Sequence, residues 1–300
     1  MQAGATVVER FAPSPNGYLH LGHAYSALLA YRAAVAADGR LLLRIEDIDQ
    51  TRARPELEAQ ILDDLAWLGI VWEEPVLRQS SRMAAYAEAL ESLRARGLLY
   101  PCFCSRQDIA AALTAPQEGA PVTGPDGLVY PGTCRGLSSE ERAAREAAGA
   151  TPALRLDMRK AIATLGGAGV VSKLSWKELG ASPTGQTGRI NLDPAALIEG
   201  CGDVVLARRD FGTSYHLSVV IDDAYQGITH VTRGEDLFEA TPIHRLLQAL
   251  LGRPTPVYRH HPLIRDKAGR RLSKRAHDAG IAELRAAGAT PKEIVAGLPF

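Results

Sequence analysis

Residues 10–23 read Arg-Phe-Ala-Pro-Ser-Pro-Asn-Gly-Tyr-Leu-His-Leu-Gly-His, and this stretch decides the fold. The apolar residues 5–8 before it are long enough for a strand, whereas residues 24–37 after it are rich in alanine and leucine and predict a helix. Two prolines and a glycine favour an irregular turn between these segments. The helix start that follows offers backbone N–H groups and a dipole end that suit a phosphate.

Two histidines, His20 and His23, stand three residues apart and share one face of the first helical turn. Imidazole donors at this position can stabilise charge that grows on a phosphate during a reaction. Taken alone, the short His-x-Gly-His pattern fits an ordinary turn with two surface histidines equally well.

A second apolar run, residues 41–45, leads into Arg44-Ile45-Glu46-Asp47-Ile48-Asp49. Strand, turn, helix and strand within fifty residues form a βαβ unit and predict a parallel sheet, in which ligands bind at the carboxyl ends of the strands. An acidic cluster can be merely a solvated turn. Beside the stretch at 10–23, Glu46 is better interpreted as a partner for the ammonium group of a substrate.

Composition narrows the class of protein. The 300 residues suit one large domain or two modest ones, and 34 basic side chains balance 34 acidic ones. Any contact with nucleic acid must therefore use a local patch. The chain shows no apolar signal core and no run of membrane-spanning length, and four cysteines do not indicate a disulfide scaffold. We expect a cytoplasmic protein that makes no membrane contact.

The stretch at 10–23 resembles the ATP-binding signature of class I aminoacyl-tRNA synthetases, and its long form resembles the glutamyl/glutaminyl branch. Further stretches are similar to the same branch in matching order. They are residues 44–49, Tyr215-His216-Leu217, Thr232-Arg233-Gly234-Glu235-Asp236 and Arg271-Leu272-Ser273-Lys274-Arg275. The last resembles the lysine-bearing mobile loop, and Lys274 matches its central lysine. The resemblance implies an α/β fold with the Rossmann-like parallel sheet of this class.

The resemblance also implies a set of site residues. Those expected to bind ATP, with magnesium, are His20, Gly22, His23 and Lys274, of which the two histidines and the lysine would be catalytic. Those expected to bind L-glutamate are Arg10, Phe11, Ala12, Pro13, Ser14, Glu46, Tyr215 and Arg233. The chemistry is coherent, because two guanidinium groups suit the two carboxylates of glutamate and Glu46 suits its ammonium. Two structural salt bridges are the alternative.

Cys102 and Cys104, followed by Tyr130 and Cys134, form a candidate metal site. Zinc prefers four ligands, so the tyrosine would have to supply an uncommon fourth. Three reduced, partly buried thiols explain the residues equally well. The glutamyl-Q tRNA(Asp) synthetases carry a Cys-x-Cys…Tyr-x3-Cys zinc site, which these residues match, whereas residues 105–128 depart from the family as an apparent insertion.

The resemblance implies a discontinuous catalytic domain (1–100 and 200–260), an inserted zinc-bearing subdomain (101–199) and a small helical part (261–300). No anticodon-binding domain is expected, because about 25 residues follow the lysine loop. The implied activity forms glutamyl-adenylate without tRNA and transfers glutamate to the queuosine base of tRNA(Asp). Alternatives are a truncated glutamyl-tRNA synthetase that charges a 3′ end, a nucleotidylyltransferase with another substrate, and an inactive tRNA-binding module.

Overall fold

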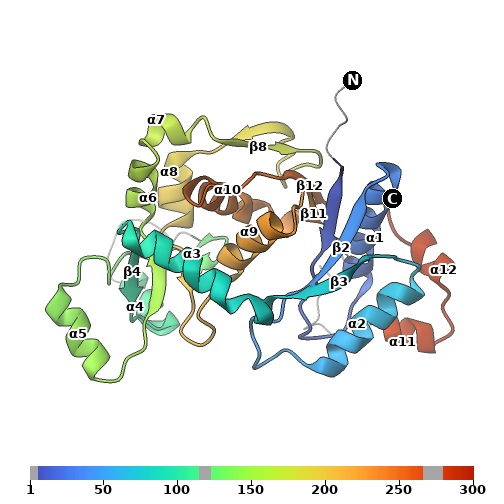
Figure 1. Cartoon of the computed structure of the whole chain (residues 1–300), viewed down its shortest axis with the longest axis horizontal. Helices are drawn as coiled ribbons and strands as arrows, with labels where there is room; N and C mark the ends of the chain where they lie inside the picture. Colours follow the sequence, from blue (N-terminus) through green and yellow to red (C-terminus); the bar gives the residue numbers. More distant parts are fainter. Residues whose placement is uncertain (1–5, 115–122, 266–279) are drawn as a thin grey trace.

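A computed structural model of the chain describes residues 6–114, 123–265 and 280–300. Figure 1 shows these residues as three regions in a row. One end holds strands β1–β3 with helices α1 and α2, the middle holds β11 and β12 beside α9 and α10, and the other end holds β4, α4 and α5. Lys274 lies outside the described residues.

The first region is a three-stranded parallel sheet in the order β1-β2-β3. Its elements are β1 (Val8–Phe11), α1 (Leu21–Ala36), β2 (Arg40–Ile45), α2 (Pro55–Trp67) and β3 (Glu73–Arg78). Leu28 of α1, Leu43 of β2 and Ile61 of α2 lie in one buried cluster, which fixes both helices against the sheet. The βαβ unit and its parallel sheet are confirmed.

The second sheet joins segments that lie far apart in the sequence. In spatial order its strands are β11 (His230–Gly234), β12 (Val257–His261), β8 (Ser175–Glu178) and β9 (Gly188–Asn191), of which the first three run parallel. The Thr229 N–H donates to the Val8 carbonyl (3.0 Å) and the Arg10 guanidinium to the Thr232 carbonyl (3.2 Å). These contacts advance along β1 and β11 in the same direction, so the carboxyl ends of the two strands meet at one edge, where such folds bind ligands.

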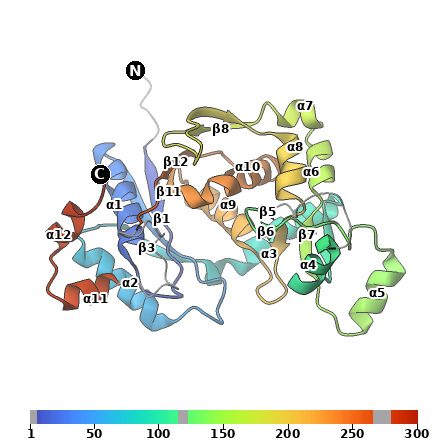
Figure 2. The ribbon, with the colours of Figure 1, turned by 180° about the vertical axis from the view of Figure 1, so that it is seen from behind.

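Helices α9 (Tyr215–Tyr225) and α10 (Thr241–Leu250) cover this sheet (Figures 1 and 2). Leu217, Val220 and Leu246 from these helices pack in one cluster with Val231 and Tyr258 of the strands. The remaining middle elements are η1 (Gln79–Arg82), α3 (Met83–Ala95), α6 (Met158–Thr164), α7 (Ala168–Val171), α8 (Pro194–Ala196), η2 (Leu197–Cys201) and η3 (Glu235–Ala240).

An antiparallel sheet in the order β10-β7-β4 forms the base of the third region. Its strands are β4 (Leu99–Cys102), β7 (Ala153–Leu156) and β10 (Val205–Ala207), accompanied by α4 (Arg106–Thr114), β5 (Thr123–Gly124), β6 (Gly127–Leu128) and α5 (Ser139–Ala147). Hydrogen bonds of two sheets cross the expected domain boundaries, since β8 pairs with β12 and β10 pairs with β7. The division into domains stays a prediction.

The last elements, α11 (Ile281–Ala286) and α12 (Pro291–Ala296), pack against the first region. Ile281 is fully buried, Arg285 forms an ion pair with Asp63 at 2.6 Å, and the Tyr25 hydroxyl donates to the Pro299 carbonyl at 2.8 Å. No helix in the described ranges is both long enough and apolar enough to cross a membrane.

Two local expectations differ from the structure. The first strand runs through Phe11, which pairs with Leu43, so Arg10 belongs to a strand rather than to the turn. Thr241-Pro242 has the sequence pattern of a helix N-cap followed by proline, but Ala240 is the N-cap of α10. The Thr241 hydroxyl instead accepts a hydrogen bond from Arg233 at 2.7 Å, so the side chain serves the site and not the helix end.

Candidate active site

A cavity of about 490 Å³ opens at the carboxyl ends of β1 and β11. All the residues expected to bind glutamate or ATP line it, apart from Lys274. They are Arg10, Phe11, Ala12, Pro13, Ser14, His20, Gly22, His23, Glu46, Tyr215 and Arg233. The structure therefore brings together side chains from four separate stretches of the chain, in a concave site of the size typical for small ligands.

The N-terminus of α1 forms one wall of the cavity. Nδ1 of His20 accepts the Gly22 N–H, and Nδ1 of His23 accepts the His20 N–H, both at 3.1 Å. Because each Nδ1 accepts, the proton of each neutral ring lies on Nε2. A Cβ at Gly22 would lie 3.0 Å from the His20 ring, so glycine leaves room for this arrangement. The result is a helix start with two oriented imidazoles, which suits an anionic group.

Glu46 follows β2 and is tied to the turn at 10–23, because its N–H donates to the Pro13 carbonyl at 2.9 Å. Its side chain is 11% exposed and lies 3.5 Å from Arg44, which is fully buried. Burial raises the pKa of Glu46, while Arg44 and Arg10 oppose that rise. A cation bound in the cavity would stabilise the ionised carboxylate further.

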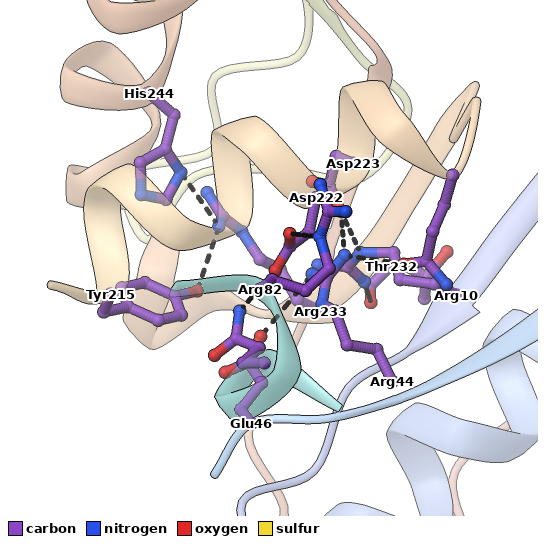
Figure 3. Close-up of polar contacts among 12 residues, drawn as sticks. Arg10, Arg44, Glu46, Arg82, Tyr215, Asp222, Asp223, Thr232, Arg233 and His244 are labelled. Carbon is purple, nitrogen blue, oxygen red and sulfur yellow. Dashed lines mark hydrogen bonds and ion pairs between the residues drawn. The ribbon is translucent and has the colours of Figure 1, made fainter. Parts of the chain in front are cut away.

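Arg10 belongs to a buried network of alternating charges (Figure 3). Its Nε lies 3.4 Å from Asp223, and the same carboxylate oxygen accepts from Arg44 at 2.7 Å. The neighbouring Asp222 accepts from Arg82 at 2.9 Å and from the hydroxyl of Tyr86 at 2.6 Å. This network joins β1, β2, α3 and α9, so the positive charge of Arg10 is already offset by acids of the protein.

Arg233, equally buried, has different neighbours. It donates to uncharged groups, as Figure 3 shows for Tyr215 and His244. The full set of partners is His260 (3.0 Å), Tyr215 (3.4 Å), His244 (3.3 Å), the Leu237 carbonyl (3.2 Å) and Thr241 (2.7 Å). Within the described parts of the chain, no carboxylate forms an ion pair with Arg233. A buried guanidinium without an acidic partner beside a cavity is a strong candidate for binding an anion.

Tyr215 lines the cavity beside Arg233. Burial raises the pKa of its phenol, so the hydroxyl stays protonated at neutral pH. The oxygen accepts from Arg233, which leaves the phenolic proton to be donated into the cavity.

Some site residues were missed by the sequence reasoning. Asn16, Asp236 and His261 also line the cavity, and His261 could have been found because it ends the strand beside β11. The residues that hold Arg233 in place, such as His260 and Glu178, are not marked by any local sequence pattern. Glu178 holds His260 through an Nδ1 contact of 2.7 Å, although 82 residues separate them in the chain.

The cysteine cluster lies in the third region, away from this cavity. The Sγ atoms of Cys102, Cys104 and Cys134 all lie within 4.8 Å of one another, and the hydroxyl of Tyr130 is 3.6 Å from Cys104. Sulfur ligands of tetrahedral zinc stand about 3.8 Å apart, so the cluster fits that metal. Burial raises the pKa of the Cys104 thiol to about 11, a cost that a bound cation would offset.

This fold, with a helix start and two histidines beside a cavity at the strand ends, defines a catalytic domain of the class I tRNA synthetase type. The family model described as "tRNA synthetases class I (E and Q), catalytic domain" matches residues 6–299. The chain belongs to this family and is an ATP-dependent ligase of the aminoacyl-tRNA synthetase type.

Relatives agree with this assignment over nearly the whole chain. A protein of Rhodobacter capsulatus named glutamyl-Q tRNA(Asp) synthetase is 55% identical over 288 residues, which cover 96% of this chain and 98% of that protein. A protein of the same name from Symbiobacterium thermophilum is 43% identical, and the match covers 97% of this chain and 85% of that protein. The crystal structure of glutamate-tRNA synthetase from Elizabethkingia anophelis matches with a TM-score of 0.75 and 26% identity. That match covers 97% of this chain but only 60% of the solved chain.

Proposed function

We propose that the protein activates L-glutamate with ATP, without needing tRNA, and transfers the glutamyl group to the queuosine base in the anticodon loop of tRNA(Asp). The observation that carries the first step is the cavity that places Glu46 and two buried arginines beside the histidine-bearing start of α1. The names of the relatives support the second step. Because the proposed substrates are ATP, glutamate and tRNA, we propose that the protein acts in the cytoplasm.

In this proposal, glutamate lies between the two walls of the cavity. Glu46 binds the ammonium, and the Tyr215 hydroxyl adds a directional hydrogen bond. Arg233 binds the side-chain carboxylate, because its charge has no acidic partner among the described residues. Arg10 faces the reacting carboxylate and keeps Asp223 as its counter-charge.

Activation is a displacement at phosphorus. A carboxylate oxygen of glutamate attacks the α-phosphorus of ATP, the bond to the β-phosphate bridge breaks, and pyrophosphate leaves. Donors at the start of α1, with the Nε2 protons of His20 and His23, stabilise the charge that grows on the phosphates. Lys274 is proposed to act on the same phosphates, together with magnesium bound to ATP, from a segment outside the described residues.

The acceptor of the glutamyl group can be tested separately from the activation step. A relative named glutamate–tRNA ligase 2, from Acidiphilium cryptum, is 40% identical and covers 96% of this chain and 60% of its own. Transfer of radioactive glutamate to queuosine-containing tRNA(Asp), queuosine-free tRNA(Asp) and tRNA(Glu) decides between the two acceptors. We expect labelling of the first substrate alone, whereas labelling of tRNA(Glu) would indicate a synthetase that charges a 3′ end.

We also propose one structural zinc ion per chain, held by Cys102, Cys104, Cys134 and Tyr130. The support is the close grouping of the three sulfur atoms and the Tyr130 hydroxyl, which accepts the Cys134 N–H at 2.7 Å. Zinc in such a site contributes folding free energy. Elemental analysis of untagged protein should find one zinc per chain; finding none would contradict the proposal, and full retention in Tyr130→Phe would exclude only the tyrosine.

A further inference from the structure

A chain of side-chain contacts leads from Arg233 away from the cavity to a surface hairpin. Arg233 lies 3.3 Å from Nδ1 of His244, and Nε2 of His244 lies 3.0 Å from Nδ1 of His216. Nε2 of His216 then lies 3.1 Å from both carboxylate oxygens of Asp126. Both histidines are buried, whereas the Asp126 side chain is 54% exposed.

The contacts in this chain can run in only one direction. A guanidinium has no acceptor, so Nδ1 of His244 must accept and the proton of its neutral ring must lie on Nε2. That proton is donated to Nδ1 of His216, whose own proton then lies on Nε2 and faces the carboxylate of Asp126. Burial and the nearby Arg233 keep the pKa of His244 well below its ordinary value, in agreement with a neutral ring.

The hairpin that carries Asp126 is held in place independently of this contact. Asp126 lies in the turn between β5 and β6, and Figure 2 shows this hairpin beside α9, the helix of His216. A Cβ at Gly124 would lie 2.2 Å from the carbonyl oxygen of Gly200 in η2. This close backbone approach fixes the hairpin against η2, and so sets where Asp126 can reach.

We propose that Asp126 is a positioning residue for Arg233 and acts through His216 and His244. Asp126 accepts the Nε2 proton of His216, so Nδ1 of His216 accepts from Nε2 of His244 and Nδ1 of His244 accepts from Arg233. This chain of hydrogen bonds fixes the orientation in which Arg233 binds the substrate carboxylate. The inference rests on the proposed role of Arg233 in binding glutamate. It also gives the segment that departs from the family, residues 105–128, a part in amino-acid binding.

The kinetic test uses tRNA-independent pyrophosphate exchange in three variants of the full chain. Asp126→Ala removes the acceptor, Asp126→Asn keeps one, and Glu199→Ala removes an exposed acid of η2 as a matched control. We expect Asp126→Ala to raise KM for glutamate about 3- to 10-fold, the size of one hydrogen bond in a network, without changing kcat or KM for ATP. Asp126→Asn and Glu199→Ala should stay within about twofold of the unchanged protein.

An unchanged KM for glutamate in Asp126→Ala would overturn the proposal. So would equal impairment of Asp126→Asn, or a parallel rise in KM for ATP, because a merely structural contact would act on both substrates. If the unchanged protein shows no exchange with glutamate at all, the proposed function fails, and a second measurement still tests the relay.

That second measurement is the tautomeric state of the histidines, from nitrogen-15 NMR of labelled protein. The relay requires the proton on Nε2 in both His216 and His244, and a mixed state of His216 in Asp126→Ala. A proton on Nδ1 of His244 in the unchanged protein would refute the relay whatever the activity.

Discussion

Arg10 and Arg233 both line one cavity, are equally buried, and differ in what surrounds them. Arg10 shares Asp223 with Arg44, whereas all the direct partners of Arg233 in the described part of the chain are uncharged. Arg10 already has an acidic partner in the protein, whereas Arg233 would gain one when an anion binds. Burial alone therefore does not identify a binding arginine; the absence of an acidic partner beside a cavity is the more informative observation.

The largest effect should come from Arg233→Ala. It removes the charge that the proposed substrate carboxylate needs, and a charged hydrogen bond is worth about 1.5–3 kcal/mol. If Arg233 binds the substrate carboxylate through two hydrogen bonds, kcat/KM for glutamate should fall by about 10²–10⁴ in the variant. Steady-state pyrophosphate exchange measures this, with Arg233→Lys as the control that keeps charge but loses the planar fork. Full activity in Arg233→Ala would break the comparison.

Arg10→Ala should cost less activity but more stability. It leaves Asp223 with Arg44 as its remaining cation, and a weakened buried ion pair costs about 1–3 kcal/mol of unfolding free energy. Arg233→Ala, by contrast, removes a buried charge that has no acidic partner among the described residues, together with the hydrogen bonds it donates to uncharged groups, and should lower the unfolding free energy less. Urea unfolding of both variants compares them directly, and equal losses of stability would contradict the difference between the two environments.

Glu46 should make glutamate binding depend on pH. Because burial raises its pKa, the carboxyl takes up a proton at a higher pH than an ordinary glutamate does. Binding of the substrate ammonium should therefore be strong at neutral pH and weaken as the pH falls through this raised pKa. Calorimetric titration with glutamate should show the decline in the unchanged protein. In Glu46→Gln the affinity should be low at all pH values, and a persisting decline would assign the titration to another group.

The smallest effect concerns Asp64, a buried carboxylate that does not line the cavity of Arg10 and Arg233. It accepts from Gln60 at 2.8 Å, its Oδ2 has no hydrogen-bond partner in the described chain, and burial raises its pKa. Because the pKa of Asp64 is raised in the folded protein, protonation of this carboxyl favours folding. This stabilisation is fully present below the ordinary pKa of aspartate, and it is lost as the pH rises through the raised pKa of the folded state. Asp64→Asn should therefore raise the unfolding free energy by about 0.5–1 kcal/mol at pH 7, and the gain should vanish toward pH 4. A gain independent of pH would point to packing instead.

The sequence predicted the parts of this site that depend on local order. The turn at 10–23, the βαβ unit and the strand ends at Glu46 and Arg233 follow from periodicity, turn residues and motif spacing, and the cavity brings them together. The supports of Arg233 could not be predicted, because Glu178, His244 and Asp126 reach it only through the tertiary fold. Thr241 illustrates the difference. The local sequence predicts a helix N-cap at Thr241, whereas in the structure its hydroxyl accepts a hydrogen bond from the buried guanidinium of Arg233.

Pyrophosphate exchange across all twenty amino acids, without tRNA, tests the central claim most directly. The account predicts exchange with glutamate alone. Glutamine would leave the charge of Arg233 unmatched, and aspartate, one methylene shorter, would not span both arginines. Exchange with glutamine comparable to that with glutamate, or no exchange with glutamate, would contradict the proposed pocket.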